Sequence, residues 1–256
     1  MHKMLILTIA ALISTTACTD QGYPDDDHFQ AWRIGGAISY EFPAMIYEAY
    51  GVNEKEDWTS IMLPYTGNMA RPSRLNMKNM RRYTYPEYDG YVLPLTGAIN
   101  FTPNQLGKGQ KSLPDELYVY WISRNNSTTY TTVVDVTPQI KAAMVKEYTY
   151  QSGSLEGQSC YQTDFIFGLL PDGRAKLWLR GCLLYTYIGE YEPTKVMPPK
   201  DPSLAKNKPI PWDKVNQVWH STNHIMQNLE DVVSSDSNGR ITYVENSVSP
   251  VSEGPK

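Results

Sequence analysis

The segment 113–138, LPDELYVYWISRNNSTTYTTVVDVTP, constrains the fold more than any other part of the chain. Asn125 and Asn126 tolerate positive φ, so they suit a two-residue turn between two antiparallel strands. That turn would place Trp121 opposite Tyr130 on the partner strand. The first strand carries bulky, largely apolar side chains on both of its faces, which is typical of a strand in the centre of a sheet.

A second hairpin is predicted between residues 161 and 191. Its turn is Asp172-Gly173, a dipeptide that strongly favours a tight two-residue turn. This turn would set Phe167 opposite Trp178. Both hairpins therefore indicate an antiparallel sheet with large aromatic side chains at its paired positions.

Two cysteines, Cys160 and Cys182, lie in the second half of the chain. An even number of cysteines in an oxidising compartment predicts a disulfide, and the alternative is two buried thiols. The predicted hairpin register sets Thr163, not Cys160, opposite Cys182, and side chains alternate between the faces of a strand. A disulfide therefore requires a bulge or an irregular turn near Ser159.

Two segments have the periodicity of helices that pack on one face. Residues 138–148 begin with Pro138, which suits the first turn of a helix. Residues 212–233 carry apolar side chains at helical spacing. The Pro- and Lys-rich stretch 192–211 is typical of a linker or long loop. We therefore expect an α+β fold: a mostly antiparallel β-sheet or sandwich with these two helices packed against it.

The N-terminus has the pattern of a lipoprotein signal peptide. Lys3 and a short apolar run precede small residues and Cys18, and the run is too short for a membrane-spanning helix, which needs about 20 residues. We expect cleavage after residue 17 and lipidation of Cys18; the alternative is an ordinary signal peptide with an incidental cysteine. Thr19 stands where an Asp would retain lipoproteins of enteric bacteria at the inner membrane, so we expect the outer membrane, facing the periplasm.

These boundaries divide the chain into four parts: a signal peptide (1–17), a flexible tether (18–30), a single β-rich domain (31–233) and a polar C-terminal tail (234–256). The domain is long enough to bury a sizeable core. The whole chain has a formal net charge of −4. A mildly acidic, exported protein is a poor candidate for nucleic-acid binding.

The sequence contains no motif that predicts an enzyme. A G-x-S-x-G elbow, a P-loop and a dinucleotide-binding glycine pattern are all absent from it. His220 and His224 have the spacing of a helical metal site, but Ser221 occupies the glutamate position of the zinc-protease motif, and a third ligand would have to come from Asp231 or from farther away. We therefore expect no catalytic residue, no cofactor and no metal, and interpret the histidines as a polar edge of the predicted helix.

The segment 71–91, RPSRLNMKNMRRYTYPEYDGY, is the most distinctive surface-like part of the chain. Arginine and tyrosine are favoured in the energetic centres of protein–protein interfaces. We predict that this segment contacts a partner, and the residues chosen for that contact are Arg74, Arg81, Arg82, Tyr85 and Tyr88. The alternative is a solvated loop that leads into an aromatic strand.

The order of these segments resembles bacterial lipoproteins of the domain of unknown function 2931 family. The resemblance covers about residues 32–191. It rests on L-P-D-x-x-x-V-x-W-x-S at residues 113–123 and on G-L-x-P-x-G-x-x-x-x-W at residues 168–178. Both motifs are structural, because they combine a turn, a strand and a packed Trp. The family has no established catalytic residues, so the resemblance implies none in this chain.

The resemblance implies a role in immunity. Lipoproteins of this sort look like products found beside lipase effectors of type VI secretion systems, where they are thought to neutralise the toxin in the periplasm. Our first hypothesis is therefore a lipid-anchored protein whose partner is a lipase-type toxin. The second is an envelope accessory lipoprotein that binds a small-molecule or cell-wall ligand. A deep pocket lined by Trp and Tyr would favour the second, and a broad aromatic face would favour the first.

Overall fold

The computed structural model describes residues 23–24, 26–60, 74–83, 86–100, 112–150 and 154–234. The predicted lipidation site Cys18, the cleavage site before it and the tail from residue 235 onward lie outside these ranges. Among the helices that the structure describes, none combines the length and the apolar character needed to cross a membrane.

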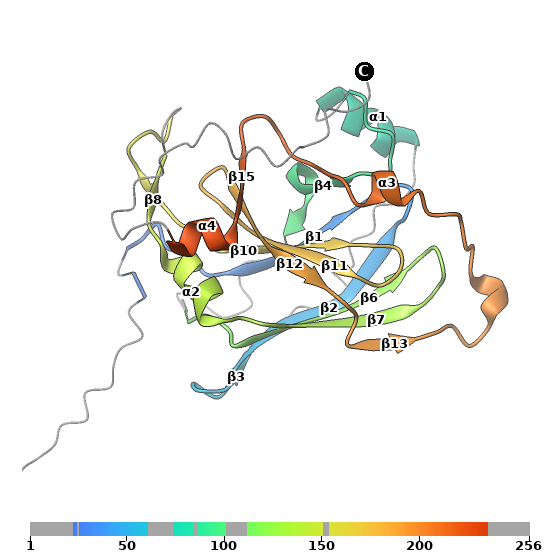
Figure 1. Cartoon of the computed structure of the whole chain (residues 1–256), viewed down its shortest axis with the longest axis horizontal. Coiled ribbons are helices and arrows are strands. Elements are labelled where there is room, and N and C mark those ends of the chain that lie inside the picture. The colour runs from blue at the N-terminus through green and yellow to red at the C-terminus, as the bar shows by residue number, and fades with distance from the viewer. Residues whose placement is uncertain are drawn as a thin grey trace, which may run out of the picture.

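Two sheets form the body of the protein and lie one above the other in Figure 1. The six-stranded sheet has the order β15-β12-β11-β10-β1-β5, and the five-stranded sheet has the order β13-β7-β6-β2-β3. The strands of the first are β1 (Arg33–Ile38), β5 (Ile99–Asn100), β10 (Asp164–Leu169), β11 (Ala175–Gly181), β12 (Leu184–Tyr191) and β15 (Ile225–Asn228). Those of the second are β2 (Ala44–Asn53), β3 (Trp58–Thr59), β6 (Glu116–Ser123), β7 (Thr129–Asp135) and β13 (Lys195–Met197).

Short elements surround the two sheets. They are α1 (Arg74–Tyr83), β4 (Leu93–Pro94), η1 (Leu95–Gly97), α2 (Pro138–Val145), β8 (Tyr148–Thr149), β9 (Ser159–Cys160), η3 (Pro202–Leu204), α3 (Trp212–Val215), β14 (Val218–Trp219) and α4 (Leu229–Ser234). Strand pairing is largely antiparallel, and the parallel exceptions are β1 with β10, β12 with β15 and β4 with β14. The predicted α+β class with a mostly antiparallel sheet is confirmed.

The main hydrophobic core lies between the two sheets. The six-stranded sheet contributes Phe165 and Phe167 to it, and the five-stranded sheet contributes Val119 and Trp121. A second core lies on the other face of the six-stranded sheet, where Trp178 packs with residues of β4, η1 and α3. The six-stranded sheet is therefore covered on both faces, whereas the two cores of the described residues involve only the inner face of the five-stranded sheet.

The first predicted hairpin is confirmed in its register. Trp121 pairs with Tyr130, and β6 lies in the centre of its sheet. The connection is longer than predicted, because Ser123 N–H donates to Thr128 O and the positive φ falls on Ser127. The observed four-residue loop and the predicted two-residue loop have the same centre, between Asn125 and Asn126. Both loops therefore pair the same residues across the strands, and the register is as predicted although the turn is different.

The second predicted hairpin is wrong in register by one residue. Phe167 pairs with Leu177 and not with the predicted Trp178. The loop has three residues, Pro171–Gly173, and Gly173 adopts a φ of +111° there, as three-residue hairpin loops require. A further tight turn follows at Cys182 and Leu183, both at positive φ, so the segment 161–191 forms three strands rather than two.

Cys160 and Cys182 form a disulfide, with their Cα atoms 5.6 Å apart. Cys182 lies in the turn between β11 and β12, and Cys160 ends β9. Residues 161–163, between β9 and β10, belong to no strand. The irregular backbone that we predicted close to Ser159 therefore lies at residues 161–163, immediately after Cys160.

The two predicted helices have different outcomes. α2 confirms the first helix and its start, because it begins at Pro138 and Thr137 caps it by accepting a hydrogen bond from Ile140 N–H. It ends at Val145, however, and Tyr148, the predicted last residue, lies in β8. The helix predicted over residues 212–233 is wrong, because α3, β14, β15 and α4 share that range. Its middle is rich in Val, Trp, His, Ser, Thr and Asn, which are weak helix formers, and β15 gains backbone hydrogen bonds by pairing with β12.

The packed chain begins earlier than the predicted boundary at residue 31. Phe29 has no exposed surface and meets the ring of Tyr161 edge-on, at 5.2 Å between ring centroids. The hydroxyl of Tyr23 accepts a hydrogen bond from Leu113 N–H at 3.1 Å. Residues 23–24 and 26–30 therefore belong to the domain and not to a flexible tether.

Candidate binding surfaces

The segment predicted to bind a partner contains a helix. α1 begins at Arg74, and Arg81 and Arg82 lie exposed in its last turn. Positive charge at a helix C-terminus is favourable because of the helix dipole, so these arginines also have a local structural role. Arg81 Nε donates a hydrogen bond to Tyr88 O at 2.8 Å, which fastens the end of α1 to the following loop.

Tyr88 does not lie on the surface, so the prediction that it contacts a partner is wrong. Its side chain is 1% exposed, and its hydroxyl donates to Val92 O at 3.1 Å and accepts from Tyr40 N–H at 3.2 Å. Burial raises the pKa of this phenol above its ordinary value. Tyr85 lies outside the described residues, so the described part of this segment offers arginines without the predicted aromatic anchor.

A different aromatic surface lies on the outer face of the five-stranded sheet. It consists of Tyr47 and Tyr50 on β2 and Tyr118 and Tyr120 on β6, and we call it the tyrosine face. Side chains alternate along β6, so Val119 fills the core while Tyr118 and Tyr120 point away from it, and on β2 the buried Ala49 precedes Tyr50 in the same way. None of the described helices in Figure 1 lies below this sheet, where the tyrosine face points.

The four rings of the tyrosine face hold one another in place. Tyr50 stacks on Tyr118, with centroids 5.0 Å apart and planes 14° apart, and on Tyr120 at 6.0 Å and 26°. The hydroxyls of Tyr50 and Tyr120 are 3.2 Å apart and form a hydrogen bond. A bulge in β2 between Ile46 and Glu48 places Tyr47 beside Tyr120, with 36% of its surface exposed.

Tyr47, Tyr50 and Tyr118 of this face each have a phenol whose pKa is raised above its ordinary value. Tyr118 donates to Glu116 Oε2 at 2.6 Å, and this hydrogen bond, with burial, raises its pKa to about 12. Burial and the hydrogen bond with Tyr120 raise the pKa of Tyr50 as well. The face therefore offers apolar ring surface and hydroxyl groups without a charge of its own, next to the carboxylates of Glu48 and Glu116.

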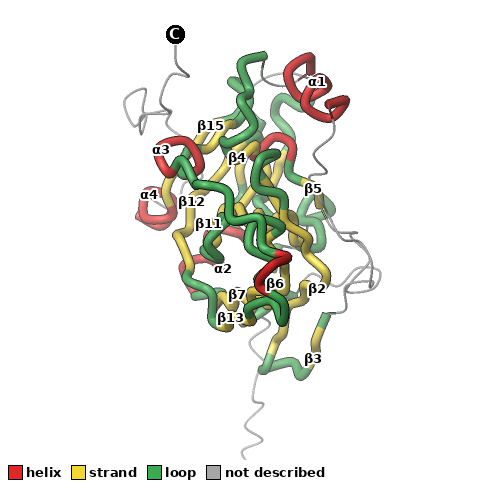
Figure 2. The backbone as a smooth tube through the Cα atoms, turned by 90° about the vertical axis from the view of Figure 1, so that its right-hand side faces the viewer, coloured by secondary structure: helices red, strands yellow, loops and turns green. Residues whose placement is uncertain are grey.

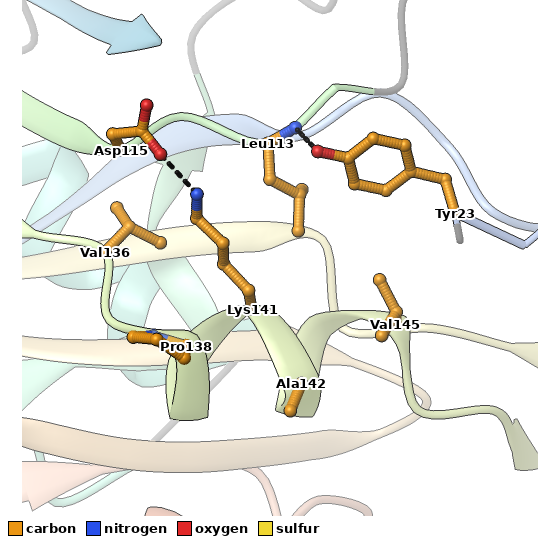
Figure 3. Close-up of a pocket in the computed structure, with 8 residues that line it drawn as sticks. All are labelled: Tyr23, Leu113, Asp115, Val136, Pro138, Lys141, Ala142 and Val145. Atoms are coloured by element: carbon orange, nitrogen blue, oxygen red, sulfur yellow. Dashed lines mark hydrogen bonds and ion pairs between the residues drawn. The ribbon is translucent and has the colours of Figure 1, made fainter. Parts of the chain in front are cut away.

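A cavity of about 480 Å³ lies beside α2, and none of its lining residues belongs to the tyrosine face. Figure 3 shows its lining residues, which are Tyr23, Leu113, Asp115, Val136, Pro138, Lys141, Ala142 and Val145. Most of the lining is aliphatic, and a single ion pair between Lys141 and Asp115 provides the charged groups. The cavity holds one Tyr and no Trp, so it is not the aromatic pocket that the ligand-binding hypothesis predicted.

His220 and His224 do not share a helix face, so the geometry assumed for them is wrong. They lie between β14 and β15, and their rings both pack on Tyr185, at centroid distances of 6.2 and 5.1 Å. His220 Nδ1 donates to Ser221 O at 3.0 Å. The described residues contain no group of three or more His, Cys, Asp or Glu arranged to hold a metal ion.

His224 should make the stability of the fold depend on pH. Burial, and after it the nearby His220 and Arg180, lower the pKa of His224 from 6.5. The unfolded chain therefore binds this proton more readily, so the free energy of unfolding should fall as pH drops below about 6.5 toward the lowered pKa. We expect His224→Gln to flatten this decline in urea unfolding measured from pH 7.5 to 5. An equally steep decline in the variant would contradict the assignment.

The fold defines a mostly β protein built from two packed sheets with few short helices. The chain belongs to the family described as Protein of unknown function (DUF2931), whose model matches residues 18–233. This match extends on both sides of the range over which the sequence motifs carried the resemblance. Comparison with curated proteins and with solved structures finds no match.

Proposed function

We propose that this protein is a lipoprotein, anchored through Cys18 in the outer membrane and facing the periplasm, which acts as an immunity protein. It would bind a lipase-type toxin of a type VI secretion system and block it. The N-terminal pattern and the family resemblance support the location and the role. The chain would act by binding and not as an enzyme.

The tyrosine face is the observation that carries this proposal. Tyrosine supplies a large contact area while losing little conformational entropy, and it is enriched in the energetic centres of interfaces. Stacking of Tyr50 on both Tyr118 and Tyr120 orders these side chains before a partner arrives. A pre-ordered surface reduces the entropy lost on binding. A broad aromatic face is also the feature that favours a protein partner over a small ligand.

The chemistry of the tyrosine face suits the surface of a lipase. An enzyme that acts on lipids must present apolar groups around its active site in order to meet its substrate. A tyrosine ring covers such groups with its apolar body, while its hydroxyl can bond to polar groups at their margin. We infer that the mechanism is occlusion: the face would cover the lipid-contacting surface of the toxin and so keep substrate out.

The arginines of α1 offer an alternative contact surface. α1 lies at the top of the molecule in Figure 1, whereas β2 and β6 form the lower layer, and Figure 2 shows the same separation from the side. A standard interface buries only about 800 Å² on each partner. One compact partner of that interface size would therefore use either the tyrosine face or the arginines, and the two can be tested against each other.

Affinity capture tests the proposed function. The chain with Cys18→Ser, which cannot be acylated, would be immobilised and exposed to an envelope extract that contains the secreted effectors of the same bacterium. We expect one stoichiometric, tightly held protein with lipase activity that is lost on binding. A capture without such a protein, or a captured lipase that stays fully active, would contradict the proposal.

Replacing Tyr50 and Tyr118 together by Ser should weaken binding of the captured lipase by about 30-fold, because a central aromatic contact is worth about 2 kcal/mol. The measurement is the dissociation constant by calorimetry. The matched variant is Arg81→Glu with Arg82→Glu, for which we expect the wild-type constant. The opposite pattern would assign the contact to α1. Urea unfolding of both variants would show that each remains folded.

A further inference from the structure

We propose that the cavity beside α2 binds one aliphatic acyl chain held in an ester or amide linkage. The proposal concerns a site separate from the tyrosine face and does not depend on the toxin. The cavity, which we call the acyl cavity, is formed by three parts of the chain. These are α2 with Val136 just before it, the segment that leads into β6, and Tyr23.

The walls of the acyl cavity fit a hydrocarbon chain. Leu113, Val136 and Val145 supply branched aliphatic groups, and Ala142 leaves room between them. A volume of about 480 Å³ lies within the range of small-molecule sites, about 300–1,000 Å³. Each methylene group moved from water into such a site contributes about 0.8 kcal/mol. A flexible, unbranched chain can therefore bind here without any aromatic platform.

The charged groups of the cavity select the kind of head group. Lys141 of α2 forms an ion pair with Asp115, which also accepts a hydrogen bond from Glu54 N–H at 2.9 Å. Burial raises the pKa of the Asp115 carboxyl, but these hydrogen bonds outweigh burial and keep that pKa below its ordinary value. Asp115 therefore stays ionised at neutral pH, where it offsets the positive charge of Lys141 that would otherwise hold a free fatty acid and itself repels the carboxylate of that acid.

A neutral carbonyl meets no such repulsion. The ammonium group of Lys141 has three N–H donors, so it can serve Asp115 and still donate to the carbonyl oxygen of an ester or amide. Figure 3 shows this side chain rising from α2 toward Asp115 at the edge of the cavity. The acyl chain would lie along the aliphatic wall, with its carbonyl near Lys141.

Two sources could supply such a chain. Tyr23, which lines the cavity, follows Cys18 by five residues, and five extended residues span at most about 18 Å. If Cys18 is acylated as proposed, its own acyl chain can reach the cavity. The other source is a membrane lipid or a lipid fragment. The linkage chemistry is shared, so the experiment must separate the two sources.

The test uses a fluorescent monoacylglycerol, a parinaric acid ester, titrated into the full chain carrying Cys18→Ser. We expect saturable binding. Ala142→Trp fills the cavity and should weaken binding at least 10-fold. Gln139→Trp is the matched control, since it adds the same side chain at an exposed position of α2 outside the cavity lining. Circular dichroism would show that both variants are folded. Absence of saturable binding, or equal binding by both variants, would overturn the proposal.

Two further measurements refine the site. Free parinaric acid should bind more weakly than its ester, and Asp115→Asn, which removes the negative charge beside Lys141, should narrow that difference; a preference of the wild-type cavity for the acid would overturn the assigned head-group chemistry. The lipidated wild-type chain should bind the ester more weakly than the Cys18→Ser chain if its own acyl chain occupies the cavity. Equal affinities would support an external lipid as the occupant. Since toxin capture involves other strands, it can fail or succeed independently.

Discussion

Replacing Asp164 by Ala is expected to lower the free energy of unfolding by about 3 kcal/mol. Asp164 is 5% exposed on β10, between Arg33 of β1 and Arg180 of β11, and both arginines are its register partners. Its carboxylate accepts from Arg33 Nε at 2.7 Å and from Arg180 Nη2 at 2.8 Å. Removing it leaves two neighbouring positive charges without their shared counter-charge. Breaking such a buried network costs about 3–5 kcal/mol, and the partial exposure of Arg33 favours the lower value.

Urea unfolding of the purified chain would measure this loss. Glu41→Ala is a suitable control, because its ion pair with Lys208 lies at the surface and should contribute less than about 1 kcal/mol. Asp164→Asn keeps the shape of the side chain and separates the loss of charge from the loss of packing. A cost for Asp164→Ala as small as that for Glu41→Ala would show that the arginines find other partners or water.

Replacing Cys160 and Cys182 together by Ala should lower the free energy of unfolding by a similar amount, about 3 kcal/mol. The disulfide closes a loop with a sequence separation of 22, and the chain-entropy relation for loops of that length yields this value. It also joins the turn between β11 and β12 to β9, outside the two main sheets. The loss would appear as a lower urea midpoint together with a somewhat steeper slope, because the unfolded chain without the cross-link exposes more surface.

The double variant has a simple comparison, because the wild-type chain treated with a reductant should lose the same stability. The contrary result is that reduction destabilises the wild type while the Ala variant keeps the stability of the oxidised wild type. That result would assign the loss on reduction to crowding of the two free thiols and would contradict a stabilising role of the cross-link. Neither treatment should alter the tyrosine face directly, since Tyr50 and Tyr118 lie on the other sheet. Partner affinity at a temperature where both forms are folded should therefore remain unchanged.

Local sequence signals were sufficient where neighbouring residues decide the structure. The pattern around Trp121 predicted the strand β6, its central place and its pairing with Tyr130, and all three are confirmed. Thr137 and Pro138 mark the start of α2 by capping chemistry that acts within one turn. The cysteine pair was also predictable, because Cys160 and Cys182 are the two cysteines of the predicted β-rich domain, so a cross-link within that domain has a single possible pairing.

The tertiary structure alone decided the features that depend on distant partners. Residues 212–233 have helical periodicity, yet β15 pairs with β12 because an open sheet edge offers it backbone hydrogen bonds. Tyr88 looked like a surface anchor and is buried by contacts with Tyr40 and Val92. Conversely, tyrosines at alternate positions of β6 were visible in the sequence, but only the pairing of β6 with β2 shows that four rings form one face.

The sequence by itself therefore determined the strands and register of the first hairpin, the capping of α2, the cysteine pair and the family of this protein. The binding surfaces were decided by tertiary structure, for a physical reason. A strand specifies which of its side chains share a face, but not whether another layer covers that face. The five-stranded sheet leaves the tyrosine face uncovered by any described helix, and the packing of α2 near Leu113 and Tyr23 creates the acyl cavity. Both arise from contacts between segments far apart in the chain.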